Sequence, residues 1–381
     1  MEDVKNVEGV AIDWIGRKLY WTTYKSETIE VATLDGKYRK VLINAGLEYP
    51  RGMAVDPIAG YLFWSDWGVT AAIERCSLDG TNRVPLVKDN ITWPNGVTLD
   101  TIQKLVYWID ANHDTINSVD YDGNQRKLIF EDTSLALSQF HGFDLDITGD
   151  SVYFTDWLQN AMVEVKISSG VVVRNISIPT TNAIKGAMGL RVVDSSKQQS
   201  GTSNCGSNNA GCEQLCFHKV PTGTSCACQL GLKLANDNKS CEDAFTDEFI
   251  MFADADAGKI YQMQLDSMNV RPIALPFDKN TNISRPVALE YDRVEDRVYW
   301  TDVTLRIICR AFRNGTGFEV LFDDIGVADG LTIDLAGRLL YWTSTTTNAV
   351  ETSKLDGSLR RTLFKWFLDE PRDIIVDPID G

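Results

Sequence analysis

The stretch YLFWSDWG at Tyr61–Gly68 places four aromatic residues and one aspartate within eight positions. Such a cluster can be an aromatic ligand site, a packing unit of a core, or one copy of a repeat. Similar stretches occur along the chain: KLYWTTY at Lys18–Tyr24, LVYWIDA at Leu105–Ala111, SVYFTDW at Ser151–Trp157, RVYWTDV at Arg297–Val303 and LLYWTST at Leu339–Thr345. The cluster is therefore one copy of a repeat.

The spacing of the copies indicates the repeat type. Their first aromatic residues lie at positions 20, 63, 107 and 153, and then at 299 and 341, after a degenerate copy at Phe249–Ala255. Each unit holds an apolar strand ending in Asp, the aromatic strand, a strand ending in LDG or YDG, and a fourth strand. Asp-Gly between two β-rich runs is a strong hairpin signal. A period in the forties with four short strands predicts β-propeller blades.

The aspartates of the aromatic strands have a structural interpretation. Alternation on a strand places the Trp of each copy and the Asp two residues later on one face. Aromatic side chains fill the space between stacked sheets, and half-buried carboxylates need donors such as the backbone N–H groups of nearby turns. We expect structural rather than catalytic acids at Asp66, Asp110, Asp156 and Asp302. Thr23 and Ser344 replace the Asp in two copies.

Composition excludes some function classes. The 381 residues are 44% hydrophobic and carry a net charge of −16 with three histidines. This charge argues against nucleic acids or anionic membranes as partners and favours basic ligands; alternatively, it only keeps a secreted surface soluble. No apolar run approaches the length of a transmembrane helix, and the start MEDVKNVEGV is not a signal peptide.

Cysteines indicate an oxidising compartment. Six of the eight lie between Cys205 and Cys241, in a segment too short and too poor in aliphatic residues to fold without cross-links. A zinc site is the alternative, but CAC is a poor chelating pair and only His218 lies nearby. Cys76 and Cys309 stand alone, and we expect both to be small buried core residues. Five glycosylation sequons add weak support for secretion: Asn90, Asn175, Asn238, Asn282 and Asn314.

YWTD repeats on both sides of a six-cysteine module resemble the low-density-lipoprotein receptor family. The markers are FWSDWG at Phe63–Gly68, WPNG at Trp93–Gly96, the LDG turns and the cysteine spacing, and the layout is closest to the Wnt co-receptor branch. The resemblance implies an all-β fold of two partial six-bladed YWTD propellers separated by an epidermal-growth-factor-like module. It also implies the disulfides Cys205–Cys216, Cys212–Cys226 and Cys228–Cys241. Because Ser200–Asn204 contains no acidic residue, we expect no calcium site, and we expect no other metal or cofactor.

The family layout also implies domain boundaries. Residues 1–194 would hold about four blades that end a first propeller, and 195–204 would be a polar linker. Residues 205–242 would form the module, and 243–381 about three blades of a second propeller. Both propellers would be incomplete and leave unpaired sheet edges. We therefore expect an internal piece of a larger cell-surface ectodomain, or an incomplete gene model, with any membrane span outside this segment.

The resemblance implies an extracellular segment that binds secreted protein ligands on the propeller face near the central channel. In the Wnt co-receptor branch, that face is lined by aromatic residues that open a blade or follow its YWTD strand. The corresponding residues are Trp67, Trp93, Phe143 and Trp157, with Arg51 and Asn95 beside them. Exposed aromatics rimmed by polar groups are typical binding hot spots. The alternative is that each aromatic residue only caps a blade.

Three other functions are alternatives to this one. Propeller hydrolases that use a channel calcium need acids and amides at the blade openings, which here carry one acid, Asp329, so we expect no enzyme. An endocytic cargo receptor, in which the propeller assists ligand release, is the main alternative. Only His113 and His141 lie in the blades, so an acid switch would need residues outside this segment. A nidogen-like matrix scaffold fits a module between two propellers less well.

Overall fold

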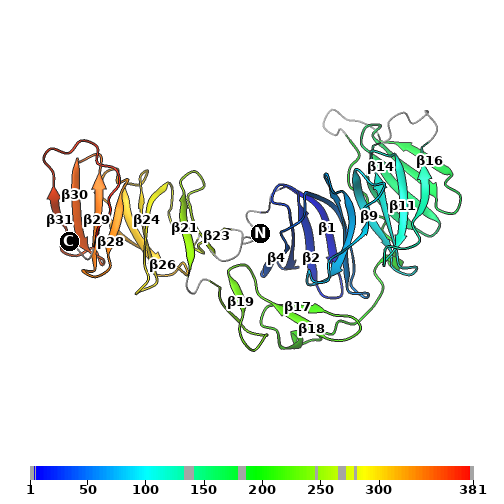
Figure 1. Cartoon of the computed structure of the whole chain (residues 1–381), viewed down its shortest axis with the longest axis horizontal. Helices are drawn as coiled ribbons and strands as arrows, with labels where there is room; N and C mark the ends of the chain where they lie inside the picture. The colour runs from blue at the N-terminus through cyan, green and yellow to red at the C-terminus, as the bar shows by residue number, and fades with distance from the viewer. Residues whose placement is uncertain are drawn as a thin grey trace. The chain divides into compact units, whose positions relative to one another are not determined.

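The computed structural model describes residues 4, 6–132, 141–178, 186–244, 248–264, 272–278 and 281–377. The described chain is built from β-strands, and its only helical segments are two short 3₁₀ turns at Ser195–Lys197 and Asn209–Gly211. It divides into two compact units, Met1–Asp243 and Ala244–Gly381 (Figure 1). The predicted all-β fold of YWTD blades around a disulfide-rich module is confirmed. Within the described ranges no helix is long and apolar enough to cross a membrane.

The first unit begins with four antiparallel sheets of four strands, and each strand pairs with its neighbour in sequence. The first sheet contains β1 (Val7–Asp13), β2 (Lys18–Thr23), β3 (Thr28–Thr33) and β4 (Arg39–Ile43), and the second contains β5 (Tyr49–Asp56), β6 (Tyr61–Trp67), β7 (Ala72–Ser77) and β8 (Val84–Val87). The third contains β9 (Pro94–Asp100), β10 (Leu105–Asp110), β11 (Thr115–Asp120) and β12 (Lys127–Glu131). The fourth contains β13 (Gly142–Thr148), β14 (Ser151–Asp156), β15 (Ala161–Lys166) and β16 (Val172–Ser177).

The second unit contains three sheets of the same kind. The first has three strands, β21 (Phe249–Asp254), β22 (Lys259–Gln264) and β23 (Ile273–Ala274). The other two have four strands each: β24 (Pro286–Asp292), β25 (Arg297–Asp302), β26 (Ile307–Phe312) and β27 (Glu319–Phe322), and then β28 (Leu331–Asp334), β29 (Leu339–Ser344), β30 (Ala349–Lys354) and β31 (Arg361–Phe364).

Aromatic residues of the YWTD strands fill the space between neighbouring sheets. The first aromatic residue of one copy shares an apolar cluster with the second aromatic residue of the next: Tyr20 with Trp64, Phe63 with Trp108, and Tyr107 with Phe154. The five tryptophans at the second position are at most 2% exposed: Trp21, Trp64, Trp108, Trp300 and Trp342. Core packing is therefore the main role of these strands, as we predicted for the repeat.

The YWTD aspartates accept hydrogen bonds from backbone N–H groups of nearby loops and turns. The donor is Tyr49 N for Asp66, at 2.8 Å, and Thr92 N for Asp110, at 2.9 Å. Asp302 accepts from Ser284 N and Asp156 from Leu158 N, at 2.7 and 2.9 Å. The predicted backbone N–H donors are confirmed for these residues. Tyr49, Thr92 and Ser284 lie at the blade openings, so the conformation of these openings depends on the carboxylates.

In four of the described blades, a hydroxyl group at the third position of the motif donates to a carbonyl group of the segment that follows the blade. Thr22 Oγ1 accepts a hydrogen bond from Gly9 N at 2.8 Å and donates to Arg51 O of the following blade at 2.7 Å. Ser65, Thr155 and Thr343 donate to the equivalent carbonyl groups of Asn95, Met188 and Arg372. A Cβ atom at Gly9 would lie only 2.2 Å from Arg51 O, so this close approach requires glycine.

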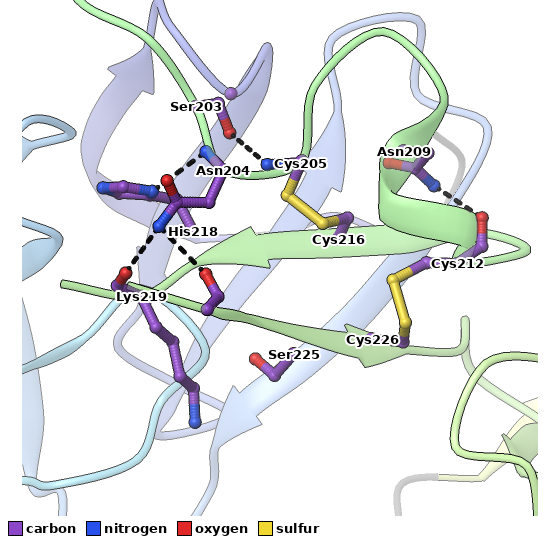
Figure 2. Close-up of a disulfide and its surroundings, with 12 residues drawn as sticks. Ser203, Asn204, Cys205, Asn209, Cys212, Cys216, His218, Lys219, Ser225 and Cys226 are labelled. Atoms are coloured by element: carbon purple, nitrogen blue, oxygen red, sulfur yellow. Dashed lines mark hydrogen bonds between the residues drawn. A yellow bond between two sulfur atoms is a disulfide. The ribbon is translucent and has the colours of Figure 1, made fainter. Parts of the chain in front are cut away.

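The module is held by three disulfides, Cys205–Cys216, Cys212–Cys226 and Cys228–Cys241. These are the pairs that the resemblance implies, and Figure 2 shows the first two. Strand β17 (Leu215–His218) pairs with β18 (Thr224–Ala227), and β19 (Leu232–Leu234) pairs with β20 (Cys241–Asp243). Outside the module, Cys76 and Cys309 are fully buried, as predicted. Burial raises the pKa of the Cys309 thiol to about 12.

The module packs against the first two blades. Leu215 and Phe217 belong to the same apolar cluster as Tyr20 and Leu62. Leu230 N donates to Arg39 O at 2.8 Å. The segment before the module is also held, because Trp14 Nε1 donates to Gln199 O at 2.9 Å and Lys197 pairs with Asp146 at 2.6 Å. The module and the preceding linker are therefore attached to the blades at several points.

Asp79 forms the main polar contact of this interface. Its carboxylate accepts from Ser225 Oγ at 2.7 Å and from Lys219 Nζ at 2.9 Å. Burial acts to raise the pKa of Asp79, but the hydrogen bonds from Thr81, Lys219 and Ser225 outweigh it and hold the pKa below the ordinary value of 3.8. A lowered pKa means that the charged form stabilises the docked state above about pH 4 and that this stabilisation is lost at lower pH.

Replacing Asp79 by Asn is expected to loosen the module. Loss of a partly exposed ion pair costs about 1 kcal/mol, or roughly fivefold in a local opening equilibrium. Hydrogen exchange of the Leu230 amide at neutral pH would measure it. Asp35 occupies the same turn position one blade earlier and bonds only within its turn, so Asp35→Asn should leave this exchange unchanged. Equal exchange in wild type and Asp79→Asn would contradict the assigned role.

Replacing Thr22 by Val is expected to weaken the contact between the first two blades. The valine keeps the volume but leaves Gly9 N and Arg51 O without their partner, which costs about 1–3 kcal/mol per unsatisfied buried group. Denaturant unfolding followed by tryptophan fluorescence would measure the change. Thr70→Val removes an exposed hydrogen bond to Glu48 and should change stability by less than about 0.5 kcal/mol. Similar losses in both variants would show that the hydroxyl does not join the blades.

Candidate functional site

Arg51, Trp67 and Trp93 form a stacked row that crosses from one blade to the next. The Arg51 guanidinium lies 3.9 Å from the centre of the Trp67 ring. Trp67 stacks on Trp93, with ring centres 5.8 Å apart and an angle of 25° between the planes. Trp93 remains 40% exposed, whereas Trp67 is half-buried. The structure therefore brings three of the predicted residues together, with the outer indole accessible.

Several contacts hold this row in place. Arg51 Nη1 pairs with Glu8 Oε2 at 3.1 Å, which anchors the guanidinium on the first blade. Trp93 N donates to Asp110 at 3.2 Å, and Trp67 ends β6 directly after Asp66. The aromatic surface is therefore fixed before any ligand arrives, which reduces the entropy cost of binding.

Asn95 connects the row to the fourth blade. The side chain is 6% exposed, and its Nδ2 donates to Gly142 O at 2.7 Å. Its Oδ1 has no hydrogen-bond partner among the described residues. In this blade Ile109 replaces the motif hydroxyl, so the Asn95 amide makes the contact between blades that a Thr or Ser makes elsewhere.

Trp157 lies beside a histidine in the fourth blade. Its ring is 40% exposed and meets His141 edge-on, with ring centres 5.9 Å apart. Trp157 N also donates to His141 O at 3.3 Å. Phe143 follows Gly142 in β13 and is half-buried. The remaining predicted residues therefore lie in the next blade, joined to the row through Asn95.

The sequence prediction missed three residues of this surface. Tyr49, at 48% exposure, and His141 occupy the position of Trp93 in their own blades. Glu8 precedes Gly9 as Arg51 precedes Gly52 and Asn95 precedes Gly96. Aligning the blade openings on these glycines would have placed Glu8 beside Arg51. We name the surface formed by Glu8, Tyr49, Arg51, Trp67, Trp93, Asn95, His141, Phe143 and Trp157 the aromatic rim.

The side chains of Asp66 and His113 lie next to the aromatic rim. Burial raises the pKa of Asp66 to about 6, although Glu48 N and Tyr49 N donate to its carboxylate. His113 Nδ1 lies 3.1 Å from Asp110 Oδ2, and its Nε2 lies 3.4 Å from Thr92 Oγ1. Both groups contact the loops that present Tyr49 and Trp93.

A groove of about 1320 Å³ runs along the innermost strands of the first unit, lined by residues of β1, β5, β9 and β13 and of the segment 189–198. Its charged groups include the ion pairs Asp144–Arg191 and Asp146–Lys197. No group of three or more His, Cys, Asp or Glu side chains in the described ranges is arranged to hold a metal ion. All five sequon asparagines are exposed.

Comparison with known proteins shows similarity along most of the chain. Residues 17–57, 60–101 and 338–378 match the low-density lipoprotein receptor repeat class B, and 205–241 match the coagulation factor Xa inhibitory site. The chain is 38% identical to low-density lipoprotein receptor-related protein 5 of Mus musculus over 335 residues. That alignment covers 87% of this chain and 20% of the relative, so the chain spans about one fifth of the relative's length.

Solved structures with similarity include a nidogen/laminin complex, with 33% identity, 46% of this chain and 65% of that chain covered, and a TM-score of 0.43. A catalytically inactive virginiamycin B lyase from Staphylococcus aureus with quinupristin has 16% identity, 90% of this chain and 93% of that chain covered, and a TM-score of 0.37. From the class B repeats and the identity to its mouse relative, the chain belongs to the low-density-lipoprotein receptor-related family, in which it forms an extracellular module of YWTD propeller blades and a disulfide-bonded domain.

Proposed function

We propose that the chain is a ligand-binding part of a single-pass cell-surface receptor and that its aromatic rim binds secreted proteins. The observation that carries this proposal is the row of Arg51, Trp67 and Trp93. Arg51 and Trp67 are held by stacking contacts, and Trp93 at the end of the row is exposed. Exposed tryptophans in a fixed setting are typical of interface hot spots. We expect a binding protein rather than an enzyme, in the manner of a Wnt co-receptor.

The chemistry of the rim indicates what a ligand would present. Trp93, Trp157 and Tyr49 offer exposed aromatic surface for an apolar side chain. Asn95 Oδ1, an acceptor without a partner among the described residues, is buried beneath this surface and is not part of the exposed face. The net charge of −16 favours ligands with a basic surface, because opposite charges steer association.

The rim can be tested with tryptophan substitutions. The double variant Trp67→Ala/Trp93→Ala should lose captured ligands, because truncating a hot-spot tryptophan costs about 2 kcal/mol or more, or roughly 30-fold in affinity. The full chain would be immobilised in conditioned medium, and bound secreted proteins would be quantified by mass spectrometry. Trp366→Ala removes a tryptophan of the second unit that is more exposed than either rim tryptophan and serves as the control. Equal capture by wild type and the double variant would rule out the rim.

A second candidate function is release of cargo in acidic endosomes, as in an endocytic receptor. The sequence prediction placed any acid switch outside this segment. The structure offers Asp66, whose pKa burial raises to about 6 and whose carboxylate holds Tyr49 N at 2.8 Å. Because the pKa in the folded chain lies above the ordinary 3.8, the folded form takes up this proton as the pH falls from about 7 to 5. A neutral carboxyl is a weaker acceptor than a carboxylate, so the hydrogen bonds from Glu48 N and Tyr49 N weaken, while the raised pKa means that the protonated side chain itself stays buried.

This candidate predicts a pH effect that depends on Asp66. A ligand captured at pH 7.4 should dissociate several-fold faster at pH 5.5 from the wild-type chain, measured by surface plasmon resonance. Asp66→Asn keeps an acceptor oxygen but does not titrate, so its dissociation rate should change little with pH. His113→Gln is the comparison variant. If His113→Gln removes the pH effect and Asp66→Asn does not, the assignment to Asp66 is wrong.

A further inference from the structure

One blade of the repeat has an extra residue in the turn after its YWTD strand. In six of the seven described blades, four residues separate the last paired residue of this strand from the first paired residue of the next strand, as between Asp110 and Thr115. In the second blade, five residues separate Asp66 from Ala72. Insertions into a regular repeat lie in loops, often on the binding face. The second blade is therefore the place to look for a further contact.

The extra residue lengthens this blade on the side of the aromatic rim. Strands β5 and β6 pair as far as Tyr49 opposite Trp67, one pair beyond the motif aspartate. In the third and fourth blades the same ladder ends at the aspartate, at Asp110 and Asp156. Two aromatic residues of the rim therefore stand at the base of the longer turn. We name residues 68–71 of this turn the Val69 loop.

The side chain of Glu48 holds the Val69 loop. Its Oε2 accepts a hydrogen bond from Val69 N at 2.7 Å, and its Oε1 accepts from Thr70 N at 3.1 Å and from Thr70 Oγ1 at 2.7 Å. Gly68 has a φ of +130°, and a Cβ atom there would overlap Glu48 Oε2, so both the turn and the approach of the carboxylate require glycine. The hydrogen bonds from Thr70 and Val69 hold the pKa of Glu48 below its ordinary value of 4.5. The carboxylate that holds the loop is therefore charged at neutral pH.

The loop presents a valine side chain to solvent. Val69 is 98% exposed, and Gly68 and Thr70 on either side of it are exposed as well. Single exposed apolar residues are common, but here an additional residue, a glycine and three hydrogen bonds fix the backbone that carries one. The second blade packs against the first and the third, so its faces are covered by described residues. The exposure of Val69 is therefore set by the loop itself.

We propose that the Val69 loop is a second contact element of the aromatic rim, an inference that rests on the proposed function. Val69 enters an apolar hollow of the secreted protein that packs on Trp93, and Glu48 is the residue that positions the loop. Trp67, which stacks on Trp93, directly precedes the loop, so the valine and the exposed indole border one surface. Because the loop is held in advance, binding has little backbone entropy to remove. The ligand must then carry a hollow for valine beside its contact with the indole.

Val69→Ser tests the contact, with conditioned medium as the probe and the full chain immobilised. Secreted proteins that the wild-type chain retains and Trp67→Ala/Trp93→Ala loses define the rim-dependent set. Because burying an exposed valine side chain contributes roughly tenfold or more to affinity, Val69→Ser should bind the rim-dependent set about tenfold more weakly. Val294→Ser changes a valine of the second unit that is 70% exposed in a turn and should bind as the wild-type chain does.

The outcomes separate this inference from the proposed function. If Val69→Ser retains the rim-dependent set as strongly as the wild-type chain, Val69 is not a contact and the rim binds without it. An empty rim-dependent set contradicts the proposed function and this inference together. A photo-reactive benzoylphenylalanine incorporated at position 69 should also cross-link to a member of the set, and one at position 294 should not. Failure to cross-link at position 69 would overturn the contact.

Hydrogen exchange tests the positioning role of Glu48. Glu48→Ala should raise the exchange rates of the Val69 and Thr70 amides about tenfold, because hydrogen bonds to a carboxylate are stronger than neutral ones. It should also weaken binding of the rim-dependent set although Val69 is still present. Glu27→Ala removes an exposed carboxylate from the corresponding turn of the first blade and should change neither quantity. Unaltered exchange in Glu48→Ala would show that Glu48 does not position the loop.

Discussion

Neighbouring blades touch at their innermost strands, and this contact governs the rest of the structure. A glycine lets the backbone of one blade approach a carbonyl group of the next, and the motif hydroxyl donates to that same carbonyl, as in Gly9, Thr22 and Arg51. Buried carbonyl groups need donors, and here the donor comes from the neighbouring sheet. The spacing between blades is therefore set by a hydrogen bond and a missing Cβ, while the aromatic residues fill the volume that this spacing leaves.

The aromatic rim depends on that contact. Arg51 and Asn95 each belong to an innermost strand, and their carbonyl groups accept the hydroxyl bonds from the preceding blade. Their side chains then project at the blade openings, where Arg51 meets Trp67. Because the loops before these strands are held by Asp66 and Asp110, the rim is positioned by the same residues that hold the blades. Arg51 and Asn95 therefore each contribute a carbonyl group to the contact between blades and a side chain to the aromatic rim.

Repeats made the fold predictable, because the same local pattern recurs and each copy supports the assignment of the others. The buried tryptophans and the YWTD aspartates followed from strand alternation alone. The contacts between distant segments did not follow. Asp79 meets Ser225 of the module across 146 positions, and no local pattern distinguishes Asp79 from Asp35, which has the same turn sequence. Glu8 was missed because the blade openings were read one by one instead of being aligned on their glycines. In the blade of His141, Asp144 stands in place of that glycine, so this alignment alone would not have identified His141.

Asn95 shows how one residue can take on two roles in such a repeat. Its blade carries Ile109 where other blades carry a hydroxyl, and the Asn95 amide reaches Gly142 O instead. That bond uses the side-chain Nδ2 of Asn95 as donor and fixes the orientation of Oδ1, which has no partner among the described residues. A substitution at Asn95 would therefore disturb the joint between two blades and the candidate site together. Loss of binding in such a variant would not distinguish the two roles, whereas Trp93, exposed and outside the joint, separates them.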